Sequence, residues 1–265
     1  MRALIADCRE MVAEQIEYRE LLRQMTGRDL RVRYKQAVMG FGWAIFMPLV
    51  NTVLFSVIFT RVASIDTPVA YPLFAFCGLW VWNSFESALR FSVNSLTSNS
   101  NLVSKVYFPR EIFPFSAILV SLVDFAVGSL VLITLMIWYH VPAGVNLLWL
   151  PIVLVVHFVF TAAVALVLAL ANLFYRDVKY LFEVMIKVWM FAAPVVYPVD
   201  RVEGTLGLLL RLNPMTPILE AYRSVLLLNS PPPAALGAAA ALALLAFVGA
   251  WLMFHRLEFR FAEYI

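Results

Sequence analysis

Residues 147–173 have the sequence LLWLPIVLVVHFVFTAAVALVLALANL, which contains no charged side chain. A helix needs about 20 mostly apolar residues to cross the hydrocarbon core of a bilayer. The stretch exceeds that length, and in water its apolar surface would have no cover. It therefore predicts a helix that spans a membrane.

Five further stretches have the same character. The six expected spans cover residues 42–60, 70–90, 113–139, 147–173, 181–199 and 234–254. The composition of the whole chain agrees, because 63% of its 265 residues are hydrophobic and only 14% are charged. We therefore expect an all-α membrane protein with six transmembrane helices, in which residues 36–265 form a single transmembrane domain.

The segment from Thr205 to Leu228 is also apolar, but it is interrupted. Asn213 and Pro214 stand in its middle, and a proline within a helix removes one hydrogen bond and clashes with the preceding turn. Each half is too short to cross a bilayer. We expect a re-entrant pair of short helices before the last span, buried in protein or lining water because hydrocarbon cannot satisfy the broken backbone.

Lysine and arginine are divided unevenly between the two ends of these spans. Eight precede the first span and two follow each of the second, fourth and sixth, whereas the other side holds four. Arg90 and Lys187 lie near or within spans and are left out of this comparison. Because positive residues collect on the cytoplasmic side, both termini are expected to be cytoplasmic and the re-entrant pair external.

Residues 1–35 precede the first span and are rich in charge. Their apolar positions recur at near-helical spacing, with acidic and basic residues between them. This pattern predicts a cytoplasmic amphipathic helix. Two roles stay open for it, an anchor at the membrane surface or a docking surface for a cytosolic partner.

An energy source for active transport is missing from the chain. A phosphate-binding loop needs two glycines five residues apart followed by lysine and serine or threonine, and no pair among the ten glycines has that spacing. A transporter would then borrow ATP hydrolysis or use an ion gradient. Candidates for ion coupling are Asp124, His157 and Glu183 with Lys187, although each also suits a satisfied polar group between helices.

An integral membrane enzyme is the second class to consider. The three histidines, His140, His157 and His255, lie on different loops or depths, and we expect no carboxylate beside any of them at ligand spacing. We therefore predict no catalytic residue, no metal site and no cofactor in this chain. No nucleic-acid partner is expected either.

Four segments carry a resemblance to a known family. They are RYKQAVMGFGWAIFMP at Arg33–Pro48, SNSNLVSKVYFPREIFP at Ser98–Pro114, FYRDVKYL at Phe174–Leu181, and PVVYP at Pro194–Pro198 with NPMTPILEAYR at Asn213–Arg223. In this order, the segments resemble permease subunits of ABC type 2 exporters, most closely the O-antigen polysaccharide group and next the teichoic-acid group. Met39 stands where that family usually has leucine.

The resemblance implies a function and partners. The chain would be the permease subunit of an ATP-driven exporter that moves lipid-linked polysaccharide across the bacterial inner membrane, with another cell-surface polymer such as teichoic acid or capsule as the alternative cargo. It would form a homodimer with two copies of a soluble ABC ATPase, which binds ATP and Mg. An ion-coupled carrier is the less favoured alternative.

The resemblance and the chemistry together name three sets of candidate residues. Coupling to the ATPase is expected from Arg33, Tyr34, Lys35, Asn101, Lys105, Phe108, Pro109, Arg110 and Glu111. Aromatic rings stack on the C–H faces of sugars, so the channel candidates are Trp43, Tyr71, Trp80, Trp82, Phe85, Trp189 and Tyr197, which also suit an interfacial belt. The external gate is expected at Asn213, Pro214, Glu220 and Arg223.

Overall fold

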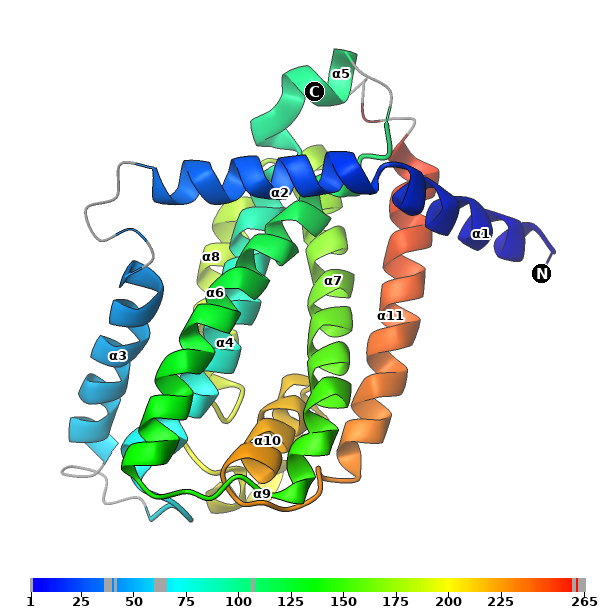
Figure 1. Cartoon of the computed structure of the whole chain (residues 1–265). Helices are drawn as coiled ribbons and strands as arrows, with labels where there is room; N and C mark the ends of the chain where they lie inside the picture. Colours follow the sequence, from blue (N-terminus) through cyan, green and yellow to red (C-terminus); the bar gives the residue numbers. More distant parts are fainter. Residues whose placement is uncertain are drawn as a thin grey trace.

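The computed structural model describes residues 2–35, 40, 42–59, 66–105, 108–258 and 261. All regular structure in these residues is helical, and they contain no strand. Long helices stand side by side, and one helix lies across an end of the bundle (Figure 1). The expected all-α class is thereby confirmed.

The described elements follow one another with short connections. The α-helices are α1 (Arg2–Glu17), α2 (Arg19–Tyr34), α3 (Gly42–Val57), α4 (Tyr71–Ser95), α5 (Ser100–Lys105), α6 (Ile112–Trp138), α7 (Leu150–Phe174), α8 (Val178–Phe191), α9 (Gly204–Leu212), α10 (Met215–Leu226) and α11 (Ala235–Leu257). Three 3-10 turns are η2 (Thr97–Asn99), η3 (Val145–Trp149) and η4 (Val199–Arg201).

Three helices in the described residues are long and apolar enough to cross a membrane. They are Ile112–Trp138, the continuous unit Val145–Phe174, and Ala235–Leu257, which match three of the six expected spans. The helix α4 has 25 residues but is less apolar, and Ile45–Val57 is a shorter apolar helix.

The expected fifth span is wrong as a continuous helix over 181–199. The helix α8 has 14 residues and ends at Phe191, and a turn occupies the next residues up to Pro198. At about 1.5 Å per residue it is about 21 Å long, whereas the hydrocarbon core is about 30 Å thick. Prolines 194 and 198 stop the helix because they cannot donate a backbone hydrogen bond. The expected break at Asn213 and Pro214 is confirmed, since α9 ends and α10 begins there.

The helix α4 forms the centre of the bundle. It packs against α3, α6, α7, α8 and α10, and most of its side chains are buried. The helix α2 crosses one end of this bundle and packs on α6. The last turn of α11 reaches the same end, whereas α9 and α10 lie at the opposite end (Figure 1).

Close packing between α4 and the turn after α8 depends on Gly78. A Cβ atom added there would collide with the backbone carbonyl of Val195 and with the guanidinium of Arg223. Glycine is therefore needed at this position for its missing side chain, although its backbone is ordinary helix.

Substitution of Gly78 tests this contact. We expect Gly78→Ala to lower the stability of the purified protein by about 1–3 kcal/mol, because overpacking forces the Val195 backbone to move. Gly249→Ala is the control, since a Cβ atom meets nothing within 4 Å there. Thermal unfolding in detergent measures both, and equal midpoints for the two variants would contradict the proposed packing.

Candidate functional site

A partly buried ion pair between side chains of α2 and α6 binds α2 to the bundle. Arg33 Nη1 lies 2.5 Å from Asp124 Oδ2 of α6, and Arg33 Nη2 donates a hydrogen bond to Ser87 Oγ at 2.9 Å. The Tyr34 hydroxyl donates to the other oxygen of Asp124. Burial and this hydrogen bond raise the pKa of Tyr34 well above its usual value. Arg33 and Tyr34 therefore face the bundle.

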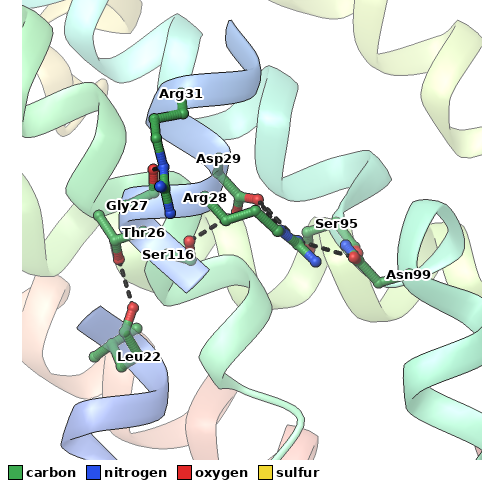
Figure 2. A network of polar contacts seen from close by, with 9 residues as sticks. All are labelled: Leu22, Thr26, Gly27, Arg28, Asp29, Arg31, Ser95, Asn99 and Ser116. Carbon is green, nitrogen blue, oxygen red and sulfur yellow. Dashed lines mark hydrogen bonds and ion pairs between the residues drawn. The ribbon is translucent and has the colours of Figure 1, made fainter. Parts of the chain in front are cut away.

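A second set of contacts lies one turn earlier on α2 (Figure 2). Arg28 pairs with Asp29 at 2.8 Å and also donates to Asn99 Oδ1 at 2.9 Å. The Ser116 hydroxyl of α6 donates to Asp29 Oδ2 at 2.8 Å, and Asn99 donates to the Ser95 carbonyl. The contacts connect α2 both to α6 and to the η2 turn that leads into α5.

A cavity of about 690 Å³ lies beneath α2. Three arginines line it, Arg28, Arg33 and Arg90, with the amides of Asn94 and Asn99 and with Asp29 as the one lining carboxylate. Arginine forks bind phosphate and carboxylate oxygens with paired hydrogen bonds. Each of these arginines is already paired, Arg28 with Asp29, Arg33 with Asp124, and Arg90 with Glu86 and Glu183, so the cavity offers an anion guanidinium N–H donors and no excess positive charge.

A second cavity, of about 420 Å³, lies on the other side of Arg33. Trp43 and Trp80 contribute aromatic surface to it, and Asn83 and Asp124 contribute polar groups. Trp80 stacks on Phe125 with ring centroids 3.8 Å apart. Two of the seven channel candidates therefore border the same cavity.

The other channel candidates pack against the rest of the chain to different extents. Tyr71 is 5% exposed, both Trp82 and Phe85 are fully buried, and Trp189 and Tyr197 are half-buried, so their place in a channel stays a prediction. Trp189 packs edge-on against Phe85 at 5.2 Å. The Tyr197 hydroxyl donates to the carbonyl of Phe191. These rings hold the fold together.

The coupling candidates divide into inner and outer groups. The helix α5 stands beyond α2 at the end of the bundle, and Asn101 on it is exposed (Figure 1). Lys35 is also exposed, whereas Phe108 and Pro109 are buried, with Phe108 against the Phe113 ring at 5.5 Å. The side chain of Lys105 lies outside the described residues.

Arg110 is half-buried and Glu111 is buried, and their contact with a partner stays a prediction. Arg110 donates to the carbonyls of Glu258 at 2.7 Å and Val103 at 3.2 Å. Glu111 is 1% exposed, and burial raises its pKa to about 7. In the described part of this connection, Ser98 of η2 and Asn101 of α5 are exposed.

The gate candidates organise the turn between α8 and α9. Arg223 is 5% exposed and donates to the carbonyls of Pro194 and Val195, each at 2.6 Å. Asn213 donates to the Ala192 carbonyl at 2.7 Å. Pro214 is the N-cap of α10. Glu220 and Asp200 line a small cavity of about 190 Å³ in the same region.

The groups considered for ion coupling have local partners. Asp124 is bound by Arg33, and His157 Nδ1 lies 3.2 Å from the Tyr222 hydroxyl. Glu183 pairs with Arg90 of α4. Arg90 also pairs with Glu86 at 2.6 Å.

The structure contains a histidine–carboxylate cluster that the sequence did not predict. His255 Nδ1 lies 3.6 Å from Glu111, 3.8 Å from Glu258 and 3.9 Å from Glu14. The expectation that no carboxylate stands at ligand spacing from a histidine is therefore wrong. The three-residue separation of His255 and Glu258 on one helical face was the available signal.

The partly buried Arg33–Asp124 pair can be tested by substitution. Asp124→Asn leaves Arg33 between α2 and α6 without its counter-charge, so we expect a loss of about 1–3 kcal/mol in the free energy of unfolding. The double variant Arg33→Gln/Asp124→Asn should recover part of that loss. The control is Asp66→Asn, because the Asp66 side chain is 92% exposed. Strictly additive losses in thermal unfolding would exclude the pairing.

Comparison with known proteins agrees with this geometry. The family model described as ABC-2 type transporter matches residues 20–227. An O-antigen export system permease protein RfbA of Myxococcus xanthus is 28% identical over 217 residues, covering 81% of this chain and 83% of the relative. Two Klebsiella pneumoniae proteins of the same name are 28% and 24% identical, covering 78% and 92% of this chain and 80% and 94% of their own lengths. The region matched by the family model contains the residues that line both cavities. It covers more than half of the chain, so the chain belongs to the ABC-2 type transporter family.

Proposed function

We propose that this chain is the membrane-spanning permease of an ATP-driven exporter that carries lipid-linked polysaccharide across a bacterial inner membrane. Its similarity to O-antigen export permeases over most of their length supports the transport role. The arginine-lined cavity beneath α2 carries the assignment of the cargo. Other cell-surface polymers on phosphate-linked carriers, such as teichoic acid or capsule, are the alternative cargo.

The proposed topology has six membrane crossings. They are α3, α4, α6, α7, the unit formed by α8 with the following turn, and α11. With α2 and the end of α11 on one side and α9 with α10 on the other, both termini are assigned to the cytoplasm (Figure 1). The positive residues before the first span support this side for α2.

The cavity beneath α2 suits the phosphate of a lipid carrier. Arg28, Arg33 and Arg90 line it from α2 and α4 near the cytoplasmic end, and their guanidinium N–H groups can donate to phosphate oxygens. A phosphate bound there would share these arginines with the carboxylates that pair with them, while its lipid chain would remain in the bilayer. This position is where a substrate made in the cytoplasm would be loaded.

The motor in this proposal is a separate ABC ATPase that binds ATP and Mg. Two copies of it would act on a homodimer of this chain. The exposed face of α5, which projects beyond α2, is the proposed docking element (Figure 1). Four other coupling candidates stabilise the structure around α5 through contacts within the chain: Arg33, Tyr34, Arg110 and Glu111.

The docking assignment predicts a separable defect. Asn101→Arg places a large charge on the exposed face of α5, so we expect loss of the co-purifying ATPase and of surface polysaccharide, with normal membrane insertion. Thr205→Arg, exposed on α9 at the opposite end, is the matched control. Co-purification of tagged chain followed by identification of its soluble partner measures the effect. Undiminished ATPase recovery with Asn101→Arg would reject α5 as the docking element.

The cargo assignment predicts a binding defect. We expect Arg28→Gln/Arg90→Gln to weaken binding of a short-chain polyprenyl diphosphate to the purified chain about 10- to 100-fold, the value of one or two charge-assisted hydrogen bonds. Arg176→Gln, at an exposed position outside the cavity lining, should bind as the unaltered chain does. An unchanged dissociation constant in the double variant would refute the cavity as the phosphate site.

A further inference from the structure

Four ionisable side chains from distant parts of the sequence meet at the cytoplasmic end of the bundle. Glu14 comes from α1, Glu111 immediately precedes α6, His255 lies in the last turn of α11, and Glu258 follows it. Three carboxylate oxygens lie 3.6–3.9 Å from the single atom Nδ1 of His255. Donor atoms of Glu111, His255 and Glu258 all lie within 4.8 Å of one another.

Three members of the cluster are buried, and several of its polar atoms lack hydrogen bonds. Glu111 is 1% exposed, Glu258 4% and His255 8%. Among the described residues, neither oxygen of Glu111 accepts a hydrogen bond, and Oε2 of Glu14 and Nδ1 of His255 also have none. Trp251 stands near Glu111, but its indole N–H is itself without a hydrogen-bond partner in the same part of the chain. Buried polar atoms without hydrogen bonds raise the free energy of the folded chain, so a ligand bound to these atoms is expected.

The donor atoms of the cluster identify the kind of ligand. Three carboxylates face one imidazole, and Arg110 is bound beside them through the Glu258 carbonyl. Carboxylate oxygens and an imidazole nitrogen that converge on one point are the donor set of a divalent metal ion.

We propose that Glu14, Glu111, His255 and Glu258 form a binding site for a divalent transition metal ion of the zinc type. Imidazole nitrogen and carboxylate oxygen are ordinary zinc ligands at about 2.0–2.2 Å, which places tetrahedral donors about 3.4 Å apart. The carboxylate oxygens lie 3.6–3.9 Å from His255 Nδ1, and the donor atoms of Glu111, His255 and Glu258 lie within 4.8 Å of one another, so a bound ion would draw these side chains closer together.

The metal would have a structural role. Its ligands join α1, the start of α6 and the end of α11, which otherwise approach one another through few polar contacts. The ion would therefore fix the inner side of the α5–α6 connection against the last helix. This inference concerns the chain's own residues and does not depend on the cargo proposed above.

Zinc content and stability test the site on the full-length chain in detergent. We expect about one Zn²⁺ per chain by elemental analysis, release by a chelator, and a rise in the unfolding temperature when Zn²⁺ is returned to the stripped protein. Glu111→Gln and His255→Gln should each weaken Zn²⁺ binding by at least about 10- to 100-fold. The exposed residues Glu17 and His140 give matched controls, Glu17→Gln and His140→Gln, which should bind as the unaltered chain does.

The same measurements contain the outcomes that would overturn the site. Stripped protein that neither binds Zn²⁺ nor gains thermal stability from it would show that the cluster is held by protons alone. Equal Zn²⁺ affinity in the cluster variants and the control variants would place the bound ion elsewhere on the surface. Should the cluster variants fail to fold, Co²⁺ added to the stripped unaltered chain decides, since the absorption spectrum of a four-coordinate nitrogen–oxygen site is expected and its absence refutes the proposal.

Discussion

Hydrocarbon offers no hydrogen bonds, so every polar backbone group at membrane depth must be satisfied by the chain itself. Regular helices meet this requirement internally, but the turn between α8 and α9 does not. Arg223 satisfies it by donating to the carbonyls of Pro194 and Val195, and Asn213 donates to the carbonyl of Ala192. The irregular backbone persists there because two side chains from the next segment replace the water it lacks.

The same constraint governs the charged side chains of the bundle. Arg33 pairs with Asp124, and Arg90 pairs with both Glu86 and Glu183. An unpaired charge within the bundle would be expensive, so these ion pairs lie where the helices meet. The same arginines line the cavity beneath α2, so the pairs that folding requires also place guanidinium N–H donors where a phosphate could bind.

The sequence predicted features that depend on local pattern and missed those that depend on contact. Hydropathy located 113–139, 147–173 and 234–254 to within a few residues, because an apolar run of that length has no alternative to a helix. It overextended the fifth span, since the residues after Phe191 are apolar enough to be helical but are held in a turn by Arg223 from α10. Such a long-range hydrogen bond leaves no periodic signal.

Site residues followed the same division. The Asn213–Pro214 break was predictable from the chemistry of proline, and the placement of a polar loop before α6 from its composition. The burial of Glu111 was not predictable, because a glutamate in a short polar loop usually faces water. His255 was overlooked since two of its three acidic neighbours, Glu14 and Glu111, lie more than a hundred residues away in the chain.

Direct contacts between helices connect the two ends of the molecule. The root of α5 is bound to α2 by Arg28 and Asn99, and α2 is bound to α6 by Asp29 and Ser116 (Figure 2). A displacement of α5 would therefore move α2 and the start of α6 together. Because α4 packs tightly on α6, and Gly78 of α4 lets the Val195 turn lie directly against it, the displacement would reach the far end without a flexible joint between. Stiff packing is what allows a push at one face to reposition the other.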